Sequence, residues 1–142
     1  MEESLKGKDR RKSERIDASF TLTYNVEKPY ILRFSLGIEE NVDTIMLNLS
    51  DIGMAIITNH NIPVGAQLYI KFNLINMRLK DDERWKFMKI TAETVSNVIL
   101  QDESHRIGIR FNRISEEDKV AIRDFVLHNK IFLDKTLGGT NV

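Results

Sequence analysis

The 142-residue chain contains no cysteine, and this absence excludes several kinds of site. Without thiols there is no disulfide scaffold, no thiolate metal site and no cysteine nucleophile. An excess of charge of one sign is also absent, because 21 Lys and Arg residues balance 21 Asp and Glu residues. Binding of nucleic acid or anionic lipid through bulk charge is therefore not expected, and any basic site must be local.

Long hydrophobic runs are missing as well. The longest uninterrupted apolar run covers residues 54–57, whereas a membrane-spanning helix needs roughly 20 apolar residues. The N-terminal segment shows no apolar core of a signal peptide. Hydrophobic residues still make up 42% of the chain, which is enough to build a core. We therefore expect one globular cytoplasmic domain without membrane insertion.

Alternation of apolar and polar residues predicts a mainly β protein with about six short strands. No helix-length segment separates these strands, so their hairpin spacing favours an antiparallel barrel over a parallel sheet. Residues 30–34 are a further strand candidate, and Trp85 is expected to be half buried in a strand. The predicted strands cover residues 20–26, 45–50, 54–58, 67–74, 85–98 and 105–111.

Residues 115–130 are predicted to form a C-terminal helix. Ser115 can cap the free backbone N–H groups, and the acidic residues 116–118 lie at the positive end of the helix dipole. An apolar face of this helix would cover an open side of the barrel. That face consists of Ile122, Phe125, Val126 and residues 129–133.

The predicted domain has polar flanks. Residues 1–9 and 135–142 are expected to be flexible tails. Residues 10–134 are expected to form a single domain, with an arm at 10–19 before a barrel at 20–112.

The arm carries a cluster of arginines. The ten residues that end at Arg15 hold six cations and two anions, a local charge of +4. Within this stretch, Arg11 and Arg15 form an R-x-x-x-R pattern that Arg10 precedes. A segment of this composition buries little apolar area, so it should be mobile alone and could close over a ligand. The same spacing at Arg106 and Arg110 lies on a predicted strand and is expected to be solvated surface.

A second polar pattern, N-x-S-x-x-G, ends a predicted strand at Asn48, Ser50 and Gly53. Asn48 and Ser50 are two residues apart and share one face of the strand, while Leu49 points into the core. Gly53 permits a positive φ or a close approach of backbone. Asn, Ser and Gly are also common in ordinary hairpin turns for local reasons, so the pattern alone does not establish a site.

Together and in this order, the two patterns resemble the PilZ domain. Residues 104–111 resemble that family's last strand, with its hydrophobic-Gly-hydrophobic-x-Phe ending, and a predicted helix follows. The resemblance covers roughly residues 10–130 and implies a six-stranded antiparallel PilZ-type β-barrel with a C-terminal α-helix. Residues 27–44 are longer than a minimal PilZ connection, so their strand pairing is left open.

The resemblance implies a non-enzymatic receptor for the bacterial second messenger cyclic di-GMP. Arg11 and Arg15 would contact phosphate and guanine, and Arg10 favours a stacked ligand dimer over one molecule. Arginine suits such a ligand because its planar fork bonds phosphate or a guanine edge bidentately and its face stacks on a purine. Closure of the arm would signal to an unidentified partner protein. The implied ligand-binding residues are Arg10, Arg11, Arg15, Asn48, Ser50 and Gly53.

Two other functions stay open. One is a PilZ-fold adaptor that contacts proteins and binds no nucleotide, although all five motif positions are filled. The other is a small barrel for single-stranded nucleic acid, against which sparse strand aromatics and neutral charge argue, so no nucleic-acid polymer is expected. The three histidines lack metal-ligand spacing, and no catalytic or phosphate-loop motif occurs, so we expect no enzyme, metal or cofactor.

Overall fold

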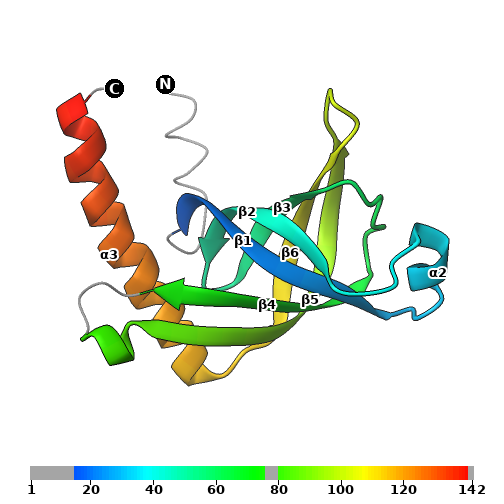
Figure 1. The fold of residues 1–142 in the computed structure, drawn as a ribbon, viewed down its shortest axis with the longest axis horizontal. Coiled ribbons are helices and arrows are strands. Elements are labelled where there is room, and N and C mark those ends of the chain that lie inside the picture. The colour runs from blue at the N-terminus through cyan, green and yellow to red at the C-terminus, as the bar shows by residue number, and fades with distance from the viewer. Residues whose placement is uncertain (1–14, 76–79, 141–142) are drawn as a thin grey trace.

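The computed structural model describes residues 15–75 and 80–140, and these form a closed barrel of six antiparallel strands (Figure 1). The strand order is β1-β2-β3-β6-β5-β4, and pairing of β1 with β4 closes the ring. The predicted antiparallel barrel with a C-terminal helix is confirmed. The strands are β1 (Arg15–Lys28), β2 (Val42–Ser50), β3 (Gly53–Thr58), β4 (Gln67–Ile75), β5 (Trp85–Ile99) and β6 (His105–Arg113).

The core fills the inside of the barrel because alternate strand residues point inward. On β4 every second residue from Leu68 to Leu74 is buried, and on β5 the same holds from Met88 to Ala92. Full burial of one large aliphatic side chain contributes about 1.5–3 kcal/mol. The alternation that predicted the strands therefore also accounts for most of the core.

The helix α3 (Glu116–Thr140) packs over one end of the barrel (Figure 1). As predicted, Ser115 is its N-cap, because the Ser115 hydroxyl accepts a hydrogen bond from the Asp118 N–H at 3.1 Å. Ile122, Phe125 and Val126 are buried in the core, which confirms the apolar face over these positions. Within the described residues no helix is long and apolar enough to cross a membrane.

The first strand and the C-terminal helix are both longer than predicted. The backbone of α3 is helical to Thr140, ten residues past the predicted end, because the sequence has no helix-breaking Pro or Gly between residues 116 and 137. At the other end β1 begins at Arg15 instead of Phe20. Residues 15–19 therefore belong to the first strand and not to a free arm.

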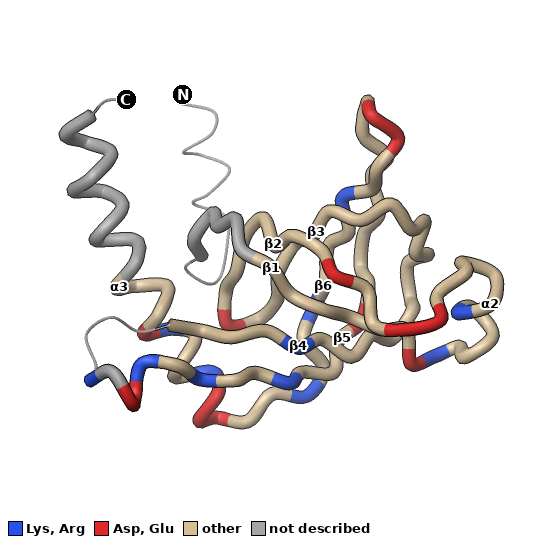
Figure 2. Tube along the Cα trace, in the orientation of Figure 1, with Lys and Arg blue, Asp and Glu red and all other residues tan. Residues whose placement is uncertain are grey.

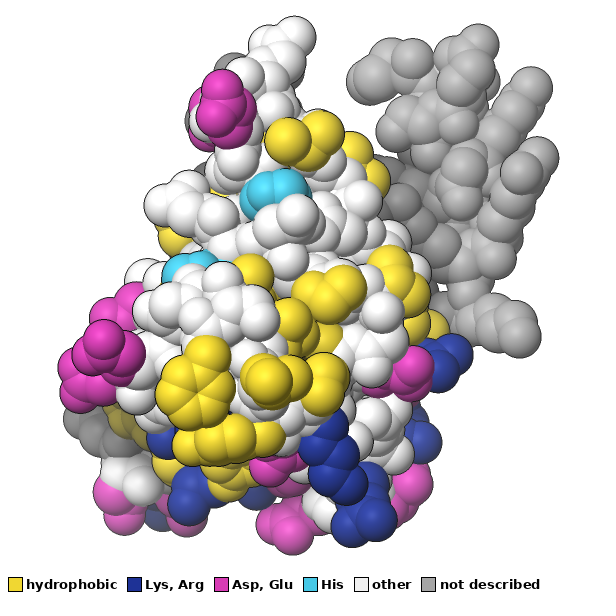
Figure 3. All heavy atoms as spheres, turned by 90° about the vertical axis from the view of Figure 1, so that its right-hand side faces the viewer, with side chains coloured by type: hydrophobic (Ala, Val, Ile, Leu, Met, Phe, Trp, Pro, Cys, Tyr) yellow, Lys and Arg dark blue, Asp and Glu magenta, His cyan; other side chains and the backbone are white. Residues whose placement is uncertain are grey.

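The predicted strand at residues 30–34 is wrong, because a short helix, α2 (Leu32–Leu36), occupies this region. The Leu32 N–H bonds the carbonyl of Pro29, and Gly37 ends the helix at φ 72°. Leu32 and Leu36 lie one turn apart and pack against the core. Hydrophobic side chains gather on the outer face at this end of the barrel (Figure 3).

The core also holds a buried hydroxyl pair. The Tyr24 hydroxyl is hydrogen-bonded to Thr58 Oγ1 at 2.7 Å, and Tyr24 has no solvent exposure. Burial disfavours the phenolate and raises the pKa of Tyr24 from 10.0 to about 12, against the opposite effect of the Thr58 hydrogen bond.

We expect alkaline pH to weaken the fold through Tyr24. Between pH 10 and about 12 the unfolded chain loses this proton while the folded chain keeps it, so the free energy of unfolding falls as pH rises. In urea unfolding across this pH window, the free energy of unfolding of Tyr24→Phe should fall by about 2–3 kcal/mol less than that of the wild type. Tyr30→Phe, at an exposed tyrosine, is the control. Parallel pH profiles for wild type and Tyr24→Phe would contradict the assignment.

Candidate ligand-binding site

The start of β1 lies beside the end of β2, where the N-x-S-x-x-G pattern occurs. Arg15 is the Cα partner of Ser50, and Asp17 is the partner of Asn48. Paired strands are about 4.8 Å apart, so backbone hydrogen bonds fix this part of the chain beside the turn. The structure thus brings Arg15 to the motif. Arg10 and Arg11 lie outside the described residues.

A bulge in the pairing of β2 with β3 sets the direction of the motif side chains. Between Met46 and Asn48, β2 advances by two residues while β3 advances by one, which leaves Leu47 as the extra residue. The extra residue reverses the alternation of faces. Met46 and Leu49 consequently both lie in the core, as predicted for Leu49, and Asn48 lies on the opposite face.

The side chain of Asn48 is buried without a hydrogen-bond partner among the side chains that the structure describes. Only 4% of the residue is exposed. Buried polar groups are nearly always paired, and leaving one unpaired costs about 1–3 kcal/mol. An amide offers both an acceptor and donors, so it can bond the edge of a purine base.

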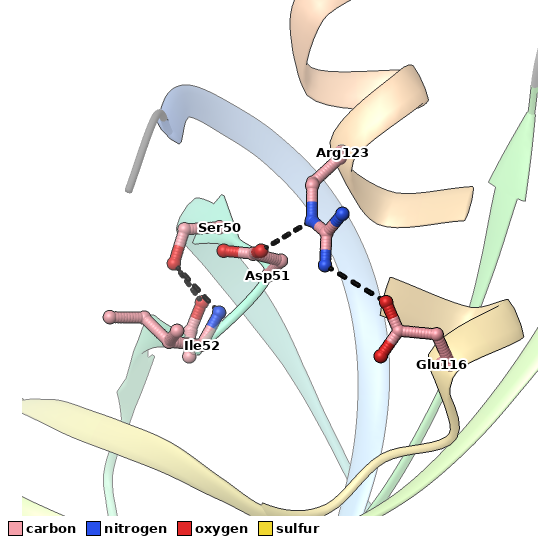
Figure 4. Close-up of polar contacts among 6 residues, drawn as sticks. Ser50, Asp51, Ile52, Glu116 and Arg123 are labelled. Atoms are coloured by element: carbon pink, nitrogen blue, oxygen red, sulfur yellow. Dashed lines mark hydrogen bonds and ion pairs between the residues drawn. The ribbon is translucent and has the colours of Figure 1, made fainter. Parts of the chain in front are cut away.

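Ser50 and Gly53 are engaged in the turn itself (Figure 4). The Ser50 hydroxyl accepts a hydrogen bond from the Ile52 N–H at 3.2 Å and donates one to the Gly53 carbonyl at 3.4 Å. At Gly53 an added Cβ would overlap the backbone carbonyl oxygen of Ile109 on β6. Gly53 has no positive φ, and its close approach is to the backbone of β6, so the fold requires this glycine without a ligand.

An ion pair that no sequence pattern predicted joins the turn to α3. Arg123 Nε donates to Asp51 Oδ2 at 2.8 Å, and Arg123 Nη2 donates to Glu116 Oε2 at 3.3 Å (Figure 4). The hydrogen bond that Arg123 donates to Asp51 is the main cause that raises the pKa of Arg123. Asp51 occupies a variable position of the motif, and 72 residues separate it from Arg123, so no local signal could have revealed the pair.

A further arginine lies close to the motif. Arg110 is the Cα partner of Gly53, and its guanidinium bonds Glu93 Oε1 at 2.9 Å on the barrel surface. The expected solvated position of Arg110 is confirmed, since 62% of its side chain is exposed. Within the described residues no cluster of three His, Asp or Glu side chains could hold a metal ion.

A comparison with protein-family models assigns the chain. The model of the PilZ domain matches residues 9–128. The chain belongs to the PilZ family. The match covers both sequence patterns, the six strands and the first half of α3. A search of the curated proteins finds no match.

Solved PilZ structures share this fold at low sequence identity. The Bacillus subtilis inhibitor of motility MotI/DgrA has a TM-score of 0.66 at 16% identity, over 87% of this chain and 52% of its own. The Escherichia coli YcgR PilZ domain with c-di-GMP has a TM-score of 0.61 at 15% identity, over 91% and 98%. A longer Escherichia coli YcgR chain in complex with c-di-GMP has a TM-score of 0.63 at 13% identity, over 93% of this chain and 51% of its own. The present chain spans about half the length of MotI/DgrA and of this longer YcgR chain.

The close approach at Gly53 predicts that Gly53→Ala destabilises the ligand-free protein. Its Cβ would meet backbone on β6 that cannot move without disturbing the ladder, so we expect a loss of about 1–3 kcal/mol in thermal or urea unfolding. Gly108→Ala is the matched control, because its Cβ would meet the Ser96 side chain, which can rotate. Equal losses in the two variants would contradict this account.

Proposed function

We propose that this PilZ protein is a receptor for cyclic di-GMP, which it binds between its N-terminal arginines and the β2–β3 turn. The pairing of Arg15 with Ser50 supports this most directly, because it sets the backbone of Arg15 close to the buried Asn48. Family membership and the likeness to a YcgR PilZ domain with c-di-GMP support the same ligand.

The ligand needs more than one arginine. A micromolar dissociation constant corresponds to about −8 kcal/mol, and one charge-assisted hydrogen bond contributes about 1.5–3 kcal/mol. Ordering the chain before β1 opposes binding by about 1–2 kcal/mol per residue. Arg10, Arg11 and Arg15 would therefore act together on the phosphates and guanine faces, with Asn48 on a base edge. Arg10 favours a stacked pair of ligand molecules.

The response to the ligand would be a change in the N-terminal segment that a partner protein recognises. The turn is joined to two other elements, to β1 by strand pairing and to α3 by the Asp51–Arg123 ion pair. A ligand on the turn would therefore act on both elements at once. We propose this conformational change as the signal to an unidentified protein.

Removal of Arg11, or of Arg15 at the start of β1, should abolish binding. In calorimetry with cyclic di-GMP, Arg11→Ala and Arg15→Ala should give no measurable heat, while the melting of the ligand-free protein stays almost unchanged. Arg106→Ala is the matched control and should bind as wild type does, with a stoichiometry of one or two ligands. If the wild type gives no heat at tens of micromolar protein, the adaptor function replaces the receptor.

Asn48 and Ser50 should separate binding from stability. Asn48→Ala should weaken cyclic di-GMP binding by about tenfold with no loss of melting temperature, because its amide has no described side-chain partner to lose. Ser50→Ala should lower the melting temperature, since the hydroxyl holds the turn, and should weaken binding less. The opposite ranking in calorimetry and melting would show that Asn48 is structural and does not contact the ligand.

A further inference from the structure

The outer face of β4 and β5 carries aromatic rings and cations side by side. Every second residue of the two strands points into the core, so the residues between them face outward. No acidic residue occurs within residues 67–75 or 85–92. Gln67 and Glu93, which bonds Arg110, lie opposite each other at one end of this outward row. The other outward residues, taken as opposing pairs, are Tyr69 with Thr91, Lys71 with Lys89, Asn73 with Phe87, and Ile75 with Trp85. We refer to these eight residues as the β4–β5 face.

The large rings of this face are open to solvent. Trp85 is 63% exposed and Phe87 is 54% exposed, so the expectation that Trp85 is half buried is wrong. Neither ring is in the core, so the fold does not explain why these positions are aromatic. A contiguous exposed apolar patch of this kind commonly marks a binding surface.

The two lysines of this face have no carboxylate partner among the residues that the structure describes. Lys71 and Lys89 are directly opposite each other, an arrangement of like charges that weakens a sheet. Lys71 Nζ lies 5.9 Å from the Tyr69 ring centroid, and Lys89 Nζ lies 5.4 Å from the Phe87 ring centroid. Neither lysine forms an ion pair within the described residues. Figure 2 shows the cationic positions of β4 and β5 next to each other.

Lys86, in contrast to Lys71 and Lys89, forms ion pairs with carboxylates. Lys86, on the other face of β5, lies 3.6 Å from a Glu117 carboxylate oxygen and 3.5 Å from one of Asp118. Arg113 of β6 is exposed, lies across from Thr91 and adds a third cation with no ion pair among the described residues. Three unpaired cations around exposed rings favour an anionic ligand that also has flat apolar faces.

We propose that the β4–β5 face binds a short single strand of nucleic acid. Bases would stack on Trp85 and Phe87, while Lys71, Lys89 and Arg113 hold the phosphates. Outward positions from Tyr69 to Ile75 span about 20 Å, which suits a site of about four nucleotides. No nucleic acid is expected from the sequence because strand aromatics are sparse. The strand register, however, gathers three of them, Tyr69, Trp85 and Phe87, on one face.

The composition of the face distinguishes this ligand from other polyanions. A duplex hides its base faces, so it could not use the exposed rings. An acidic peptide could pair with the lysines, but the side chains of Asp and Glu have no ring that would stack on Trp85. Single strands meet both requirements, and the interaction would be independent of base sequence because every base has a π face.

Trp85 is the only tryptophan in the chain, so its emission reports directly on this face. A fluorescein-labelled oligothymidylate of about eight nucleotides, added at low salt, should quench Trp85 emission and gain anisotropy in parallel. Phe87→Ala should weaken binding by about tenfold, and Phe34→Ala, at an exposed aromatic of α2, should not change it. Three phosphate contacts predict a log–log salt slope near −2, and Lys89→Ala should reduce its size by about 0.7.

Two results would overturn the proposal. The first is unchanged Trp85 emission with the oligonucleotide. The second is that polyglutamate or heparin quenches Trp85 emission and displaces the labelled oligonucleotide as well as unlabelled oligothymidylate does. The face would then bind anions by charge alone. Arg11→Ala separates this proposal from the receptor function, because it should lose cyclic di-GMP binding and retain the oligonucleotide. Phe87→Ala should behave in the opposite way.

Discussion

The backbone pairing between β1 and β2 is the constraint on which the proposed ligand-binding site depends. The second part of β1 pairs with both β2 and β4 around Thr23 and Tyr24, which closes the barrel. Its first part, from Arg15, pairs with β2 alone. One strand therefore closes the barrel with its second part and brings the backbone of Arg15 to the turn with its first part. The position of Arg15 needs no ligand, since ladder hydrogen bonds fix it.

Two bulges make this pairing compatible with a polar motif. The register of β1 shifts between Asp17 and Phe20, and that of β2 shifts at Leu47. Without the β2 bulge, Asn48 would share the inward face of Met46 and bury its amide in an apolar core, which costs several kcal/mol. The bulge sends Leu49 inward instead, so the strand supplies a core residue and a polar site from neighbouring positions.

Strand alternation sufficed to predict the barrel, because one period of two residues specifies both the strands and the core. The same reasoning failed at residues 30–34, where the two apolar contacts are spaced by four residues and form a helical turn. The charge of residues 15–19 predicts an arm, although Ile16 and Ala18 alternate with polar residues as in a strand. The Asp51–Arg123 pair and the β4–β5 face were beyond sequence reasoning, since each depends on the register of residues far apart in the chain.

The first turns of α3 contact the β2–β3 turn and the strand β5, and so link the neighbourhoods of the two proposed sites. Arg123 bonds Asp51 in the β2–β3 turn and Glu116 at the start of α3, and Glu117 and Asp118 pair with Lys86 of β5. Each pair has at least one partner that is more than a third exposed, and such pairs contribute about 0–1 kcal/mol each. Coupling carried by these ion pairs in series is limited by a single pair at about 1 kcal/mol, which corresponds to a change in affinity of about fivefold. Occupancy of one site therefore adjusts the other without controlling it, and a large response to cyclic di-GMP would have to arise in the N-terminal segment.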